Sequence, residues 1–174
     1  PDLVVSRTRD FHLTRSLEER GAIVVNPPLV SEVCNDKVST LELAESLGIP
    51  FLPYSLPDSP FPPGPPWVVK SRIGHGGTEV HMAHDSVELD GKLQLLHDRM
   101  PMVQTVAPRI GADMRCYLSE GELLAAVLRT SDSDFRANHG LGGRAELCEP
   151  PEPVFDILDR ITDAIHPDFI GVDF

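Results

Sequence analysis

The feature that most constrains the fold is a lysine at the end of an apolar strand, followed by a glycine-rich loop. Residues 67–70 and 79–83 have the apolar character of strands, and the loop between them contains Gly74, Gly76 and Gly77. Glycines let backbone N–H groups approach anionic oxygens, and a buried ammonium such as that of Lys70 is costly unless it meets an anion. The spacing is neither that of a Walker A loop nor that of a GxGxxG loop opening a helix. It predicts a hairpin lid over phosphates; a plain glycine-rich hairpin with a surface lysine is the alternative.

The segment before this hairpin predicts a strand–helix–strand unit and a further helix. Residues 3–5 and 22–25 are short apolar runs, and residues 11–20 between them have helical spacing, which is the order of a βαβ unit. Residues 29–47 also show a helical pattern, and 51–54 form a brief strand. Residues 55–66 are rich in proline, which is typical of a stiff linker; a proline-rich docking ligand is the alternative.

The segment after the hairpin predicts an α+β lobe rich in antiparallel strands. A tight turn at Glu120-Gly121 joins two of the strands. A long polar stretch, 130–149, precedes the last elements. The predicted helices are 85–99 and 154–165, and the predicted strands are 102–106, 113–119, 123–129 and 170–174.

Composition excludes several classes of protein. The net charge of −12 argues against a nucleic-acid partner, because phosphate backbones are bound by pooled lysines and arginines. No apolar run approaches the roughly 18 residues that span a bilayer. Cys34, Cys116 and Cys148 form no CxxC pair, so we expect reduced, partly buried thiols in a cytoplasmic protein. Apolar segments stand at both ends, which leads us to expect the interior of a longer chain.

Two charged positions stand at the ends of predicted elements. Lys37 follows Asn35-Asp36, which has the character of a helix N-cap, and a cation in the first turn opposes the helix dipole. We expect Lys37 either to meet an anion or to be a solvated lysine. Asp173 ends the last predicted strand, where a carboxylate can hold Mg²⁺ over a nucleotide; a solvent-facing aspartate is the alternative.

A third group of charged residues predicts a clamp for oxyanions. Asp113 and Arg115 share one face of a strand, and Arg129 ends the next strand of the hairpin. Arg136 and Asn138 follow in the segment Asp-Phe-Arg-Ala-Asn. The arginine fork suits bidentate contacts to phosphate, metal-bound groups or carboxylate. A surface ladder of ion pairs is the alternative.

Read in order, these segments resemble the ATP-grasp superfamily, and within it the RimK-like glutamate ligases that extend a ribosomal protein with glutamate. The resemblance covers nearly the whole chain. The matching motifs are Asn26 with Asn35-Asp36-Lys37 and Gly48-Ile49-Pro50, Val68-Val69-Lys70 with the glycine loop, Val103-Gln104, Gly111-Ala112-Asp113-Met114-Arg115, the segment 134–138 with Gly142-Gly143, and Gly171-Val172-Asp173. It implies the ATP-grasp fold, two α+β lobes gripping ATP, preceded by the end of a βαβ lobe. The implied boundaries are 1–28 for that lobe and 29–174 for an ATP-grasp domain truncated at its C-terminus, with a lid subdomain at about 67–102.

The resemblance assigns residues to each part of the nucleotide. Lys37, Lys70 and the glycine loop would contact the phosphates. The hinge residues Gln104, Thr105 and Val106 would lie at the adenine edge, where the backbone around Thr105 and Val106 reads the base, and Asp113 would hold the ribose.

The resemblance also implies phosphoryl transfer to a carboxylate, giving an acyl phosphate that an amine attacks. Arg136 would steady the transferred group with Asn138 beside it, Arg115 and Arg129 would complete the clamp, and Asp173 would bind Mg²⁺ or Mn²⁺. The expected substrates are a small-molecule or peptide carboxylate and an amino acid such as glutamate. A homo-oligomer remains open, as does the identity of the acceptor.

Two departures from the family pattern leave other functions open. The glutamate that usually follows the hinge glutamine is Thr105 here, and the Glu-x-Asn motif expected soon after Asp173 is not reached. A regulatory module that binds ATP without turnover is therefore one alternative. An ATP-grasp kinase or another ligase subclass is the other, which the segment 134–138 disfavours.

Overall fold

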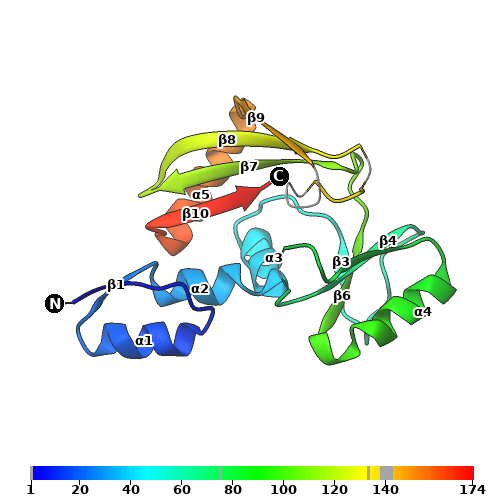
Figure 1. Ribbon diagram of the computed structural model, residues 1–174, viewed down its shortest axis with the longest axis horizontal. Coiled ribbons are helices and arrows are strands. Elements are labelled where there is room, and N and C mark those ends of the chain that lie inside the picture. The colour runs from blue at the N-terminus through cyan, green and yellow to red at the C-terminus, as the bar shows by residue number, and fades with distance from the viewer. Residues whose placement is uncertain (1, 75, 133, 138–142) are drawn as a thin grey trace.

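The computed structural model describes residues 2–74, 76–132, 134–137 and 143–174 and shows the expected mixture of helices and antiparallel sheets (Figure 1). A small N-terminal unit contains β1 (Leu3–Val5), α1 (Phe11–Glu19) and β2 (Ile23–Val25), with the two strands parallel and Leu3 opposite Ile23. This confirms the predicted strand–helix–strand unit. Asp10 caps α1 by accepting hydrogen bonds from two backbone N–H groups of its first turn.

Asn26 joins this unit to the distant end of the chain. Its side-chain amide donates to the carbonyl of Phe169 over 2.7 Å and accepts from the N–H of Phe169 over 2.8 Å. Because Phe169 begins the last strand, β10 (Phe169–Asp173), one asparagine side chain fixes that strand beside the N-terminal unit.

The helical pattern of residues 29–47 is two helices in the structure, α2 (Pro28–Cys34) and α3 (Lys37–Ser46), so the pattern is not one continuous helix. The expected helix N-cap at Asn35-Asp36 is confirmed, with Asp36 as the capping residue. Asp36 is extended and its carboxylate accepts from the N–H of Val38, and Asn35 closes α2. Asparagine and aspartate side chains compete for nearby backbone groups and so favour helix ends over helix interiors. The break makes Lys37 the first residue of α3.

The glycine hairpin belongs to a four-stranded antiparallel sheet in the order β3-β6-β4-β5. The strands are β3 (Tyr54–Ser55), β4 (Trp67–Ser71), β5 (Val80–Ala83) and β6 (Pro101–Thr105). Helix α4 (Ser86–Leu95) and the short 3₁₀ helix η1 (His97–Arg99) lie between β5 and β6 in sequence, and Leu89 and Leu96 pack against Val69, Ala83 and Val103. The predicted pairing of the two strands around the glycine loop is confirmed, with Lys70 opposite Val80.

The second antiparallel sheet has the order β10-β7-β8-β9. Its other strands are β7 (Ala112–Ser119), β8 (Glu122–Thr130) and β9 (Arg144–Cys148). The predicted turn between β7 and β8 is confirmed, with positive φ at both Glu120 and Gly121. Strand β9 lies inside the stretch 130–149, where we expected only polar loop. It pairs with β8 alone and is mostly exposed, which explains why its sequence lacks the apolar signal of a strand.

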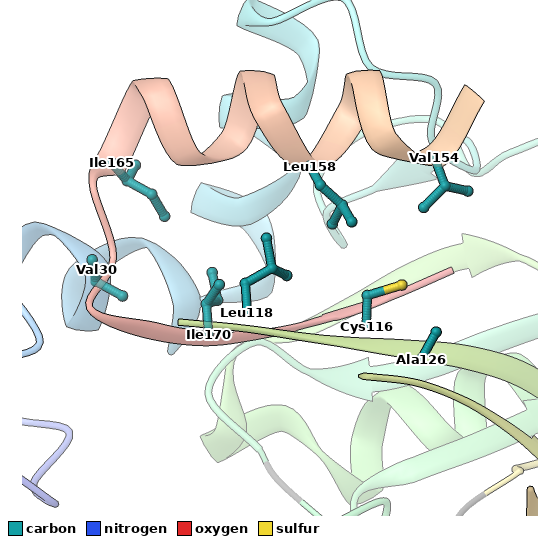
Figure 2. Packing of buried hydrophobic residues seen from close by; sticks show 8 residues of the cluster. All are labelled: Val30, Cys116, Leu118, Ala126, Val154, Leu158, Ile165 and Ile170. Atoms are coloured by element: carbon teal, nitrogen blue, oxygen red, sulfur yellow. The ribbon is translucent and has the colours of Figure 1, made fainter. Parts of the chain in front are cut away.

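Helix α5 (Glu152–Ile165) covers one face of the second sheet, as Figure 2 shows. Leu158 and its helix neighbours point toward the inward side chains of the sheet, among them Cys116 and Leu118, which are fully buried. The intervening residues of β7, including Asp113 and Arg115, therefore face the other way, toward the cavity described below. Of the helices in the described ranges, none combines the length and apolarity that a membrane span requires.

Candidate functional site

A cavity of about 840 Å³ lies where residues from both sheets converge. Its size is within the range of small-molecule sites. It collects every site residue that the sequence predicted, except Asn138, which with Gly142 lies outside the described residues. The predicted residues that line it are Lys37, Lys70, Gly74, Gly76, Gly77, Gln104, Thr105, Val106, Asp113, Arg115, Arg129, Arg136 and Asp173.

Lys70 enters the cavity from β4. Its Nζ donates to Oε1 of the buried Gln104 over 2.7 Å, and Gln104 in turn donates from Nε2 to the carbonyl of Leu52 over 3.0 Å. Burial, with a smaller contribution from the charge of Lys37, lowers the Lys70 pKa to about 8. The ammonium therefore has an uncharged acceptor, and an anion in the cavity would offer it a stronger partner.

Lys37 enters from the first turn of α3. Its Nζ donates to the carbonyl oxygens of Ser71, Arg72 and Gly74 over 2.8, 3.3 and 2.6 Å. Burial is the main reason that the Lys37 pKa lies below its ordinary value. The sequence left two alternatives for this cation, an anion or solvent; in the structure its ammonium donates to three carbonyl groups at the base of the glycine loop.

Arg136 connects the glycine loop to the segment that follows β8. Its Nη1 donates to the carbonyl of Gly77 over 2.6 Å, and its Nε and Nη2 bond both oxygens of Asp134 over 2.9 and 2.7 Å. Hydrogen bonds from Arg136 lower the pKa of Asp134 to about 2. The glycine loop and Arg136 are therefore in direct contact.

The residues of the predicted clamp lie together, and its two strand arginines are paired with aspartates, as in the alternative of a ladder of ion pairs. Arg129 bonds Asp113 through two hydrogen bonds of 2.6 Å and also reaches Asp173 over 2.8 Å. Arg115 bonds Asp173 from Nε over 2.6 Å and from Nη2. The predicted proximity of Arg129 to the face of Asp113 is confirmed, since the two residues are opposite each other in the strand register. Two arginines and two aspartates thus form one network on the cavity wall.

Sequence reasoning missed several apolar residues that also line the cavity, here called its apolar wall: Leu52, Val68, Val80 and Ile110. Thr105 lines the cavity too, and its buried hydroxyl has no hydrogen-bond partner among the described residues. Apolar walls with a few oriented polar groups suit a planar base. The sequence signal for this apolar lining was weak, because its residues come from separate strands and loops and resemble ordinary core residues.

Gly111, one residue of the motif Gly111-Ala112-Asp113-Met114-Arg115, has a conformation that requires glycine. Its φ is +68°, and a Cβ there would lie 2.7 Å from the carbonyl oxygen of Ser131. Its own N–H donates to the carbonyl of Phe135, and its carbonyl accepts from the N–H of Ser131. Only glycine permits this close approach, which fixes the segment carrying Arg136 against the start of β7.

The carboxylates of the cavity give an incomplete donor set for a divalent metal. Mg²⁺ in such sites takes one or two carboxylates together with phosphate oxygens and water. Asp173 offers one carboxylate, and it accepts from Arg115 and Arg129. No group of three or more histidine, cysteine, aspartate or glutamate side chains positioned for a metal occurs in the described ranges.

Comparisons with known proteins show that this chain is similar in sequence to several ligases. The sequence profile of the RimK-like ATP-grasp domain matches residues 63–174. The human N-acetylaspartylglutamate synthase A is 28% identical over 194 residues, covering 99% of this chain and 50% of that protein. The glutamate–LysW ligase ArgX of Sulfurisphaera tokodaii is 27% identical, covering 97% of this chain and 65% of that protein. The chain thus spans about half to two thirds of these relatives.

Solved structures show the same fold. The D-alanine–D-alanine ligase of Bacillus anthracis complexed with ATP superposes with a TM-score of 0.74 at 18% identity, covering 99% of this chain and 62% of that one. A RimK-domain ATP-grasp protein of Sphaerobacter thermophilus gives 0.71 at 16% identity, covering 98% and 66%. The predicted ATP-grasp fold is therefore confirmed.

Proposed function

The chain belongs to the RimK-like ATP-grasp family, and on that premise we propose that its cavity binds ATP and couples a carboxylate to the amine of an amino acid. The observation that carries the proposal is that Lys37 and Arg136 both bond carbonyl groups of the glycine loop, and that Lys70 lines the same cavity. We further propose the division that the sequence suggested, with the ATP-grasp domain beginning at residue 29 and its lid at about 67–102.

The proposed roles follow the position of each side chain. Lys37 and Lys70 neutralise phosphate oxygens beneath the glycine loop. The backbone around Thr105 and Val106 holds the adenine against the apolar wall, with the unpartnered Thr105 hydroxyl free for a polar contact. Asp113 holds the ribose.

The proposed reaction has two steps. A carboxylate oxygen of the acid attacks the γ-phosphorus of ATP, ADP leaves, and an acyl phosphate forms. The amine then attacks the acyl carbon, loses a proton, and releases inorganic phosphate as the amide forms. Phosphoryl transfer depends on positioning and charge neutralisation. Arg136, with Asn138 in the same motif, steadies the transferred group, and Arg115 and Arg129 orient the acid.

No covalent nucleophile is needed from the protein. Burial raises the pKa of the Cys116 thiol, so it does not form a thiolate readily. Cys34 is exposed at the surface and Cys148 half-buried, so the expectation that all three cysteines are partly buried was right only for Cys148. Free thiols in all three support a cytoplasmic location.

We propose Asp173 as one ligand of a divalent metal, Mg²⁺ or Mn²⁺, whose charge would offset that of the phosphates. To serve in this way, Asp173 exchanges at least one of its arginine hydrogen bonds for the metal. The protein's own contribution is to hold this carboxylate at the end of β10, opposite Arg115 in the register.

We propose glutamate, or an amino acid like it, as the amine substrate. The support lies in the relatives, whose names are those of an N-acetylaspartylglutamate synthase and a glutamate–LysW ligase. The glutamate unit is common to both names.

The test is ADP release by the full-length protein with ATP, Mg²⁺, a panel of acids and a panel of amino acids that includes glutamate. Release is expected only when an acid and an amine are both present. When the acid carries ¹⁸O in its carboxylate, one ¹⁸O should appear in inorganic phosphate, because that oxygen bridges the acyl phosphate. Absence of ADP release with every pair, or release without ¹⁸O in phosphate, would refute the ligase.

A second candidate is an ATP-binding module without turnover. The observation that favours it is the occupation of Asp173 by two arginines, which leaves the described part of the chain without a ready metal ligand. ATP binding with Mg²⁺-independent affinity and no ADP release with any pair would support this module.

A further inference from the structure

A second cavity, of about 360 Å³, lies beside the first, at the carboxyl ends of the two parallel strands β1 and β2. Open sheets of parallel strands bind ligands at this edge. Segments from three parts of the chain form it: the loop after β1, helix α2 with its end, and the start of β10. The lining residues are Ser6, Arg7, Thr8, Arg9, Asn26, Val30, Ser31, Cys34, Asn35, Phe169, Ile170 and Gly171.

The charge of this cavity is the reverse of that of the whole chain. Asp and Glu outnumber Lys and Arg by 27 to 15 in the sequence, yet the lining contains two arginines, Arg7 and Arg9, and no carboxylate. Hydroxyl and amide groups complete it. Asn35 donates to the carbonyl and the hydroxyl oxygen of Ser31, which leaves the hydroxyl hydrogen of Ser31 free to donate. The lining therefore offers donors for an anion.

Neither Arg7 nor Arg9 has a side-chain hydrogen bond or ion pair within the described ranges. Most of the other arginines there do pair with carboxylates: Arg15, Arg72, Arg99, Arg115, Arg129, Arg136, Arg144 and Arg160. Two free guanidinium groups at one cavity that no carboxylate lines are suited to bind a carboxylate in bidentate fashion.

The two cavities are neighbours. Gly171 lines the second cavity, and a Cβ placed on it would lie 3.6 Å from Cδ of Arg115, which lines the first. Arg9 is also close enough to Lys37 to contribute to the lowering of the Lys37 pKa. The cavities therefore share a wall at Gly171 and Arg115.

We propose that the second cavity binds a carboxylate of the acid substrate that does not react, so that the acid has at least two carboxylates. The inference rests on the proposed function, because it takes the first cavity as the site of phosphoryl transfer. Arg7 and Arg9 hold the remote carboxylate, and the reacting carboxylate lies beside Arg115, facing the phosphates. An acid with one carboxylate lacks the contact to the two arginines.

The experiment measures binding directly, so that it does not depend on turnover. Succinate, glutarate and citrate are each titrated calorimetrically into the full-length protein without nucleotide, alongside the mono-amide of glutarate. The variants are Arg7→Gln and Arg9→Gln, with Arg20→Gln as the matched control, because Arg20 is exposed, lies outside both cavities and also lacks an ion pair. Circular dichroism checks that each variant is folded.

At least one of the three acids should bind the wild type, and each of Arg7→Gln and Arg9→Gln should weaken it by about tenfold or more, as expected for a charge-assisted hydrogen bond. Arg20→Gln should bind as the wild type does, and ATP affinity should be the same in all four proteins. Glutarate mono-amide should bind more weakly than glutarate if glutarate is the acid that binds.

Failure of all three acids to bind, or equal affinity in the wild type and both cavity variants, would overturn the proposal. An acid that competes with ATP would also overturn it, because that acid would occupy the first cavity. If binding follows the expected pattern while no ADP is released with any substrate pair, the second site stands and the ligase reaction is refuted.

Discussion

Lys70 gives a sharp prediction, because its lowered pKa makes its charge depend on pH just above neutrality. In the free protein its pKa is about 8, and its only hydrogen-bond partner within the described ranges is the side-chain oxygen of Gln104. If ATP phosphates bind the ammonium, the bound state keeps the proton well above pH 8. ATP binding above that pH then requires proton uptake, so affinity should fall as the pH rises.

The size of the effect follows from the fraction of Lys70 that is protonated before binding. With a pKa of about 8, the apparent Kd for ATP is raised by about 1.1-fold at pH 7 and by about 11-fold at pH 9 relative to the fully protonated protein. The predicted loss of affinity between these pH values is therefore about tenfold. Lys37, whose pKa is also lowered, can add to the loss but cannot reverse its sign.

The measurement is the Kd of ATP at pH 7, 8 and 9 for the wild type, Lys70→Met and Lys92→Met. Lys92→Met is the control, because Lys92 lies on α4 outside the cavity and should show the wild-type dependence. Lys70→Met should bind more weakly at pH 7, by about tenfold or more for a lost charge-assisted contact, and lose most of the pH dependence. An ATP affinity that is flat from pH 7 to 9 in the wild type, or equally pH-dependent in Lys70→Met, would refute the reasoning.

Three further predictions concern stability, each measured by denaturant unfolding. Gly111→Ala should cost about 2 kcal/mol or more, since it strains a positive φ and meets a carbonyl at 2.7 Å, whereas Gly91→Ala, in an open helical position, should stabilise by about 0.5–1 kcal/mol. Leu158→Ala should cost about 2–4 kcal/mol by leaving a cavity under α5, and Leu147→Ala, which is 79% exposed, less than about 0.5. Asn26→Ala should cost about 1–3 kcal/mol, because two backbone groups of β10 lose their partner. Equal effects within either pair, or none at Asn26, would contradict these packing arguments.

Sequence reasoning predicted the structure best where strands that are close in sequence also pair with each other. The glycine hairpin was predictable because Lys70 and its glycines sit between two apolar runs, and the pairing follows from their order. Asp113 and Arg129 were predictable as neighbours because a tight turn at Glu120-Gly121 sets the register of the two strands.

Features that depend on distant parts of the chain escaped sequence reasoning. Strand β9 has no apolar alternation, since only its pairing with β8 makes it a strand. The apolar wall around Leu52 and Ile110 and the cavity around Arg7 and Arg9 are assembled from segments far apart in sequence. The pairing of Asp173 with both Arg115 and Arg129 was not predicted, because Asp173 belongs to a strand far from these arginines in sequence.

The hydrogen bonds of the first cavity separate its cations into two classes. Within the described ranges, Lys37 and Lys70 donate only to uncharged acceptors, carbonyl groups and an amide, so an incoming anion displaces no carboxylate from them. Arg129 and Arg136 each bond an aspartate, so an incoming anion must share or displace a carboxylate to reach them. An anion such as phosphate can thus contact the two lysines without breaking an ion pair. It can contact the two arginines only after their ion pairs with aspartates rearrange. We therefore expect the arginines to contribute to charge neutralisation after the nucleotide has bound, because their contribution, unlike that of the lysines, requires their ion pairs with aspartates to break.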